Sequence, residues 1–391
     1  MSPTSPAPTP SPPVTSAGYL HVLQRPWVVT YEIDPTGRLR PPVTQHVSNE
    51  LFALAGEPRG RFVYGAHGGW SLFGNGTGGG SDLTIATYAP DPRDGTLVEL
   101  SYATVAHRPS GEPCISCFDI GEWTWLNGGV GRAYGLWLFR WGTTGRHKTY
   151  TYASVAVAGD GRLGPVIARS FMSDTDPGQV LVDVRSDQLY KAGRRPRGTD
   201  DGRGGLEAHV IEADGTLTRT GWTNLCLGST MCEYCAPSPL VSARGFVFAS
   251  VLFERGQDLL CSYQGLRLKP LDALDFAASA AAAFVPSSEA DPALLAMNVD
   301  FAIGGLTRHE LRLFSMSAEG DLRPLDSEEL PDPATRILFH PSRPFLYVVD
   351  KASQLRAYAV DANGRLERLM IADHAGGSIA ITHKDAWAED R

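Results

Sequence analysis

The sequence contains no apolar run long enough to cross a membrane. A membrane-spanning helix needs about 20 consecutive apolar residues, and the apolar stretches of this chain are shorter and interrupted by glycine or proline. Residues 1–17 are almost entirely Pro, Ser, Thr and Ala, and they lack the basic start and apolar centre of a secretory signal. We therefore predict a disordered tail at 1–17, a cytoplasmic location and no membrane partner.

Segments with a helical period are scarce, and no cofactor motif is present. The glycine-rich stretch at 74–80 is followed neither by a helical pattern nor by the Lys-Ser/Thr pair of a phosphate-binding loop. The formal net charge of −8 argues against nucleic acid as a general partner. We expect a protein that needs no cofactor.

What the chain has in quantity is turn-forming residues between short alternating apolar segments. It holds 42 glycines and 28 prolines. One phrase recurs, in which alternating apolar residues with an aromatic are followed by a glycine turn and then a leucine, as in LRLFSMSAEGDL and LRAYAVDANGRL. The turn glycines of the copies are Gly37, Gly95, Gly161, Gly215, Gly265, Gly320 and Gly364. Period-two alternation across such a turn predicts a β-hairpin.

Seven hairpins at intervals long enough for four strands each predict an all-β, seven-bladed β-propeller. The last copy shows all four strands, which we name A to D from the inside outward, at 335–340, 345–350, 354–360 and 366–371. The first copy has only B and C strands, 18–24 and 27–33, before its turn. A lone A strand at 374–382 follows the last copy. We predict one domain, residues 18–391, in which the C-terminal strand completes the N-terminal blade and closes the ring.

The phrase HPSRPFLYVVDKASQLRAYAVDANGRLERL resembles the lactonase seven-bladed propeller family. That family includes bacterial 6-phosphogluconolactonases and fungal enzymes that lactonise 3-carboxy-cis,cis-muconate, and LFALAGEPRGRFVYGA is similar to its muconate branch. The resemblance implies a small, often anionic, lactone or carboxylate bound at the channel. It also implies a His, two Arg and a Glu there. Glu254 matches the Glu, whereas Ala168 or Arg169, Ala236 and Asp300 stand at the other positions.

Histidine and glutamate are the natural acid–base candidates because the imidazole pKa lies near neutrality. We expect the catalytic candidates at or near the channel mouth, and they are His46, His107, Glu254 and His374. Arginine binds carboxylates in a bidentate manner. The substrate-binding candidates are Arg169, Arg194, Arg195, Glu112 and Glu233. We expect three long B-to-C loops on the same face, at 67–82, 140–149 and 186–205. The last loop carries the arginine cluster; the alternative to substrate binding is that this loop is a solvated surface segment.

Four of the six cysteines form two C-x₂-C pairs, Cys114 with Cys117 and Cys232 with Cys235. Both pairs lie where an inner A strand is expected to begin. The spacing is that of zinc ligands, but residues three apart on a strand point to opposite faces. Packing thiols or local disulfides are therefore the favoured interpretation, with metal binding and redox chemistry as alternatives. Cys261 falls in a C strand, and we expect it to be buried.

Three functional hypotheses follow. The first is a monomeric, cofactor-independent enzyme of lactone chemistry, acting on a small anionic molecule as a lactonising isomerase or as a lactone hydrolase. The second is a non-catalytic propeller that binds a protein or ligand on its loop face, because a fold does not fix a function. The third is a metal protein that uses the cysteines as ligands.

Overall fold

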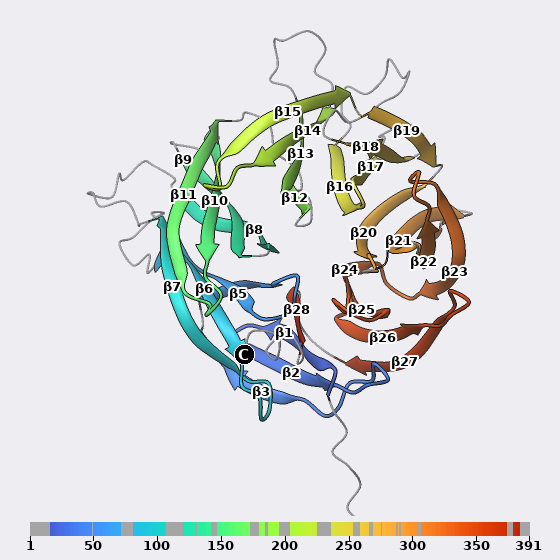
Figure 1. Ribbon diagram of the computed structural model, residues 1–391, viewed down its shortest axis with the longest axis horizontal. Helices are drawn as coiled ribbons and strands as arrows, with labels where there is room; N and C mark the ends of the chain where they lie inside the picture. Colours follow the sequence, from blue (N-terminus) through green and yellow to red (C-terminus); the bar gives the residue numbers. More distant parts are fainter. Residues whose placement is uncertain are drawn as a thin grey trace, which may run out of the picture.

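The chain folds as a seven-bladed β-propeller in which each blade is a four-stranded antiparallel sheet, and the blades stand in a ring around a common axis (Figure 1). The structure is a computed structural model. It describes residues 16–48, 50–71, 81–106, 120–129, 131–141, 147–172, 180–183, 187–194, 204–224, 236–252, 259–265, 269–274, 276–286, 288, 291–303, 306–373 and 378–383. No helix that could cross a membrane is found among these residues.

The strands of each blade are ordered from the axis outward. Blade 1 consists of β28 (Ser378–His383), β1 (Gly18–Gln24), β2 (Trp27–Ile33) and β3 (Val43–His46). Blade 2 consists of β4 (Leu51–Gly56), β5 (Val63–Ser71), β6 (Ser81–Pro90) and β7 (Leu97–Ala106). Blade 3 consists of β8 (Ile120–Gly129), β9 (Arg132–Trp141), β10 (His147–Val157) and β11 (Leu163–Met172).

The other four blades repeat this order. Blade 4 consists of β12 (Val180–Asp183), β13 (Gln188–Arg194), β14 (Gly204–Ile211) and β15 (Leu217–Asn224). Blade 5 consists of β16 (Ala236–Ala243), β17 (Phe246–Leu252), β18 (Leu259–Gln264) and β19 (Lys269–Leu274). Blade 6 consists of β20 (Ala277–Phe284), β21 (Ala293–Ile303), β22 (Leu306–Met316) and β23 (Leu322–Leu330). Blade 7 consists of β24 (Ala334–Phe339), β25 (Phe345–Asp350), β26 (Gln354–Val360) and β27 (Leu366–Asp373).

The C-terminal strand closes the ring, as predicted. β28 pairs antiparallel with β1 from Ser378 opposite Leu23 to His383 opposite Gly18. Of the predicted strand 374–382, residues 374–377 lie outside the described residues, and β28 is described from Ser378 onward. The fully buried His21 ties it in place, because Nε2 lies 3.0 Å from the hydroxyl of Thr382 on β28 and Nδ1 lies 3.0 Å from the hydroxyl of Thr30 on β2.

The turn glycines hold the positions that the repeat predicts. All seven have positive φ angles, from 67° to 92°, a region that glycine enters without the steric cost of a side chain. In blades 2, 3, 4, 6 and 7 the leucine that ends the phrase is the first residue of the D strand. Gly364 also shows a second requirement, since a Cβ there would lie 2.7 Å from Leu325 of blade 6. The turn therefore fixes both the hairpin and the packing between blades.

Side chains on one D strand bind the backbone of the next blade. The amide of Gln45 on β3 donates to the carbonyl of Leu97 and accepts from its N–H, at 2.8 Å each. Ser101 accepts from Leu163 N–H at 3.3 Å, and Asp326 accepts from Leu366 N–H at 2.8 Å. These bonds satisfy the first backbone groups of the D strands and link neighbouring blades.

We expect Gln45→Ala to lower the free energy of unfolding by about 1.5 kcal/mol, because two backbone groups of Leu97 lose their partners. Urea denaturation measures the effect. Thr44→Ala is the matched control, since Thr44 is an exposed neighbour on the same strand. Equal stabilities of the two variants would contradict a linking role for Gln45.

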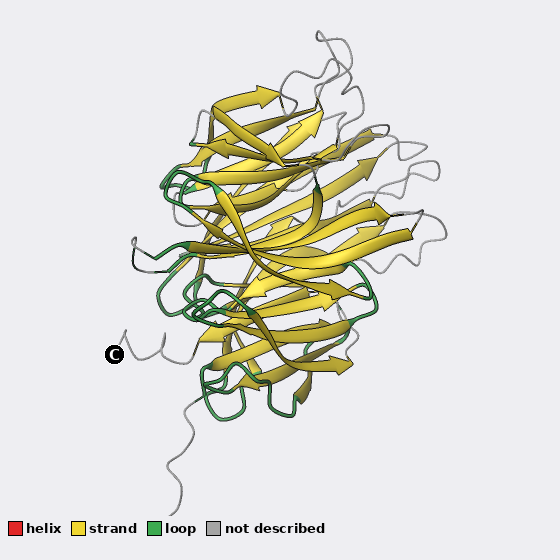
Figure 2. Ribbon diagram, turned by 90° about the vertical axis from the view of Figure 1, so that its right-hand side faces the viewer, coloured by secondary structure: helices red, strands yellow, loops and turns green. Residues whose placement is uncertain are grey.

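The ring has two different faces, seen edge-on in Figure 2. On one, the loop face, the B and D strands end and the C and A strands begin. On the other, the turn face, lie the A-to-B and C-to-D turns. Blades 2 and 3 are also joined directly, because Trp70 and Ser71 at the end of β5 pair with Gly121 and Ile120 of β8.

The structure corrects several predicted boundaries. The 186–205 segment is not one loop, because β13 occupies Gln188–Arg194. The segments 67–82 and 140–149 are also shorter as loops, since β5 runs to Ser71 and β9 to Trp141. Ala168 and Arg169 lie on the outer strand β11 rather than on an inner strand. Ser16 and Ala17 belong to the domain rather than to the tail, because Ala17 N–H donates to Ile33 at 2.8 Å.

Candidate functional site

The candidate site lies on the loop face between blades 6 and 7 and starts from the alternation of strand β21. In the run Met297-Asn298-Val299-Asp300, the first and third residues pack with the blade 5 side of the core. The second and fourth point to the opposite face, as strand geometry requires. Asp300 is paired with His309 across the β21–β22 hairpin. Side chains of directly opposed residues share a face at close range, so the register brings this carboxylate and imidazole together.

A buried asparagine holds the carboxylate. Asn298 is fully buried, and its Nδ2 donates to Asp300 Oδ1 at 2.8 Å and to Ser279 Oγ at 2.7 Å. Its Oδ1 accepts from the N–H of Ala334, the first residue of blade 7, at 3.1 Å. The orientation of the amide is fixed because the backbone N–H can only donate. Asp300 is thus anchored by groups from three strands.

Asp300 in turn orients His309. Its Oδ1 lies 2.7 Å from Nδ1 of the imidazole. Because a carboxylate only accepts, Nδ1 carries the proton, and the neutral ring keeps its lone pair on Nε2. The His309 side chain is 18% exposed and that of Asp300 is 31% exposed, so solvent or a ligand reaches the pair. This is the carboxylate–histidine arrangement of a general base.

An arginine stands on the adjacent inner strand. Arg336 lies two residues beyond Ala334 on β24 and is exposed. Even so, the surrounding protein lowers the pKa of its guanidinium by desolvation. A side chain that projects from the innermost strand toward the axis of the ring satisfies both observations. Its Nη1 donates to the carbonyl of Thr335 at 3.2 Å. Within the described part of the chain it forms no ion pair, which leaves its charge for an anionic ligand.

A second histidine lies on the loop-face half of blade 2. The Nε2 atom of His67 on β5 is 2.6 Å from the hydroxyl of Tyr88 on β6. Burial lowers the pKa of His67, and the nearby carboxylate of Glu50 acts in the opposite direction. Burial also raises the pKa of Tyr88. The pair is neutral at pH 7 and partly buried, so it packs beside the loop face rather than forming an exposed base.

Most candidates named from the sequence fall outside the described residues. These are His107, Glu112, Arg195, Glu233, Glu254, His374, Cys114, Cys117, Cys232 and Cys235. Their proposed roles therefore stay predictions. The A strands that follow the cysteine pairs in the sequence are described from Ile120 and from Ala236 onward.

The remaining candidates are placed but do not converge. His46 is the last residue of the outermost strand of blade 1 and packs edge-on against Trp27, with ring centroids 4.9 Å apart. Arg169 lies on the outermost strand of blade 3, and Arg194 ends β13. Cys261 is buried on β18, as predicted. Among the described residues, no group of three or more His, Cys, Asp or Glu side chains could hold a metal ion.

The pairing of Asp300 with His309 was not predicted, although the sequence contains a pattern that indicates it. The glycines 304 and 305 divide the segment 293–316 at its midpoint, and a hairpin turn there makes residues whose numbers sum to 609 face each other. That rule pairs Asp300 with His309. The family resemblance had drawn attention only to Asp300, at a position where an arginine was expected.

Comparison with solved structures supports the fold. The chain is similar to a periplasmic gluconolactonase from Pseudomonas aeruginosa, PpgL, with 18% sequence identity and a TM-score of 0.57, over 93% of this chain and 99% of that one. It is also similar to a functionally unknown protein from Desulfotomaculum acetoxidans, with 12% identity and a TM-score of 0.52, over 94% and 99%. No protein-family model matches the sequence. No curated protein matches it either. These likenesses show the seven-bladed propeller fold.

Proposed function

We propose that this protein opens or forms small lactones at the loop-face site, with His309 as the general acid–base and Arg336 as the group that binds a substrate carboxylate. The observation that carries the proposal is the chain of hydrogen bonds from buried Asn298 through Asp300 to His309. The fold shared with a gluconolactonase gives it further support.

The chemistry needs only a base, a water molecule and an orienting cation. In hydrolysis, Nε2 of His309 takes a proton from water while the oxygen attacks the lactone carbonyl carbon. The bond from that carbon to the ring oxygen breaks, and the ring oxygen receives the proton from the imidazolium. Asp300 stabilises the imidazolium while it exists. Lactonisation is the reverse, in which His309 removes the proton of the attacking hydroxyl.

The test is hydrolysis of D-glucono-1,5-lactone and of muconolactone, followed by acid release in a pH-stat. We expect His309→Gln and Asp300→Asn each to lower kcat/KM at least 100-fold, the usual scale of a lost general base. His46→Gln is the control, because His46 is exposed on an outer strand. No hydrolysis above the uncatalysed rate with either lactone, or full activity in His309→Gln, would refute the proposal.

Arg336→Gln separates binding from chemistry. Muconolactone carries a free carboxylate and gluconolactone does not, so we expect the substitution to raise KM at least tenfold for muconolactone while leaving KM for gluconolactone within twofold. An equal change for both lactones would show that Arg336 does not bind the carboxylate.

A further inference from the structure

A serine and two histidines meet on the turn face, on the opposite side of the ring from the loop-face site. Ser342 and His340 belong to the A-to-B turn of blade 7, and His383 is the last residue of the closing strand β28. Ser342 is exposed and His383 is half-buried. The Oγ atom of Ser342 lies 2.9 Å from Nε2 of His383, although 41 residues separate them in the chain.

His340 positions both partners. It is fully buried, and its Nδ1 accepts the backbone N–H of Ser342 at 3.3 Å. Its ring packs edge-on against the ring of His383, with centroids 5.2 Å apart and planes at 69°. Burial, with a contribution from His383, lowers the pKa of His340 to about 4. His340 is thus a neutral acceptor at pH 7 and keeps the serine turn in place.

The third support comes from blade 2. The N–H of His383 donates to the carbonyl of Gly60 at 2.8 Å. Gly60 has a φ of +74°, and a Cβ there would lie 2.7 Å from the Cβ of His383. The absence of a side chain at Gly60 therefore makes room for the histidine. Elements of blades 7, 1 and 2 fix the Ser342–His383 contact, so the pair is preorganised rather than an accident of two mobile surface groups.

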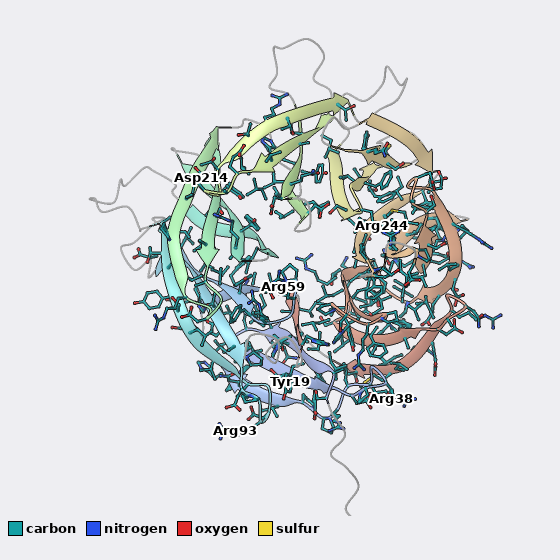
Figure 3. The ribbon with its side chains drawn as sticks, in the orientation of Figure 1. Tyr19, Arg38, Arg59, Arg93, Asp214 and Arg244 are labelled. Atoms are coloured by element: carbon teal, nitrogen blue, oxygen red, sulfur yellow. The ribbon has the colours of Figure 1, made fainter. Side chains whose placement is uncertain are left out.

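The surroundings of the pair carry positive charge. Arg59 precedes Gly60 in the same turn and is exposed, and Figure 3 shows it at the inner ends of the first two blades. Arg343 follows Ser342, and its Nη1 donates to the carbonyl of Pro35 at 3.1 Å. The nearby carboxylate of Glu57 accepts the N–H groups of Arg59 and Arg61 and faces the Arg61 guanidinium at 3.6 Å. A substrate with a negative charge suits this surface.

We propose that Ser342 and His383 form a nucleophile–base pair that accepts the acyl group of an ester carrying a carboxylate on its acyl part. In the first step the hydroxyl proton of Ser342 passes to Nε2 of His383 while Oγ bonds to the ester carbonyl carbon. The ester C–O bond then breaks, and the departing alkoxide takes the proton from His383. Water reverses the sequence and releases the acid and free Ser342.

Fluorophosphonate labelling of the full-length protein, with intact mass and peptide mapping, tests the pair directly. We expect one adduct on Ser342, formed at least tenfold more slowly in His383→Gln and absent in Ser342→Ala. Ser327→Ala is the control, because Ser327 is exposed on β23 and no histidine of the described part of the chain bonds to it. Heat-denatured protein should not react, and circular dichroism of each variant verifies folding.

Turnover of mono-4-nitrophenyl succinate and of 4-nitrophenyl acetate tests the charge preference. We expect at least tenfold higher kcat/KM for the succinate, with the preference reduced in Arg59→Gln. An adduct on another residue, labelling unaffected by His383→Gln, or no adduct at all would overturn the nucleophile assignment. Equal turnover of both esters would overturn the anionic acyl class. The Ser342 adduct is independent of lactone hydrolysis on the loop face, and ester turnover is assigned to the turn face only if it is lost in Ser342→Ala and retained in His309→Gln.

Discussion

Acidification from pH 7 to pH 5 is expected to lower the free energy of unfolding by about 4 kcal/mol through two buried histidines, His21 and His340. Both are fully buried in the folded protein. Desolvation lowers the pKa of His21 to about 3 and that of His340 to about 4. The environment of His21 consists of the Thr30 and Thr382 hydroxyls, one on each ring nitrogen, and burial is the cause of its shift.

The sign follows from which state binds the protons. A histidine in the unfolded chain titrates near pH 6.5, whereas these two resist protonation in the fold until pH 3 to 4. Between those limits the unfolded state binds more protons, so stability falls as the pH falls. Each histidine contributes about 2 kcal/mol of this loss at pH 5, at 1.36 kcal/mol per pKa unit.

Urea denaturation at both pH values measures the loss. We expect His21→Gln and His340→Gln each to reduce the difference between pH 7 and pH 5 by about 2 kcal/mol, whatever their stability at pH 7. His46→Gln serves as the control, since His46 is exposed. A double variant with the same pH dependence as the unmodified protein would show that these histidines do not control acid stability.

The acid sensitivity is concentrated where the ring closes. His21 bonds β28 to β1 and β2, and His340 packs against His383 at the end of β28. We therefore expect hydrogen exchange of residues 378–383 to be the first to accelerate as the pH is lowered.

Repetition explains why the fold was predictable. In each blade a glycine with positive φ fixes the hairpin turn, and the same turn recurs in all seven blades. The strands of blade 7 and the first two strands of blade 1 were therefore placed within one or two residues. The pairing of the closing strand was predicted correctly. The first blade has no A strand of its own in the N-terminal sequence, so the edge of its B strand needs a partner.

The errors arose where the repeat is weak. In blade 4, β13 follows a short inner strand β12 of four residues, Val180–Asp183. The arginine-rich continuation of β13 lacks apolar alternation, so the strand was taken for a loop. Alternation of apolar residues with a period of two indicates that a residue is in a strand, but it does not indicate which strand of the blade that is. For that reason Arg169 and His46 were placed near the channel although they lie on outer strands.

The sites depend on contacts that local pattern does not contain. The pairing of Asp300 with His309 was accessible from the hairpin register. In contrast, Ala334, which fixes Asn298, is 36 residues away on another blade, and Ser342 and His383 meet only because the ring closes. Such contacts follow from the angle between blades, which side-chain packing sets.

Gly128→Ala is expected to lower the free energy of unfolding by about 3 kcal/mol, because the inner strands approach backbone to backbone at that point. A Cβ on Gly128 of β8 would lie 2.1 Å from the carbonyl oxygen and 2.9 Å from the carbonyl carbon of Gly56 on β4. A Cβ on Gly56 would lie 3.1 Å from the carbonyl oxygen of Ile381 on β28. The A strands of blades 1, 2 and 3 are thus in direct backbone contact.

No rotamer change can relieve the Gly128→Ala clash, since the obstructing atoms belong to the main chain of a neighbouring blade. The blades must separate, and the loss of contact spreads to the core between blades 2 and 3 around Tyr64 and Ala133. Gly159→Ala is the matched control, because Gly159 is an exposed turn residue with nothing within 4 Å of an added Cβ. We expect the control to lie within about 0.5 kcal/mol of the unmodified protein in urea denaturation. Equal stabilities of the two variants would show that the inner strands do not depend on glycine for their close approach.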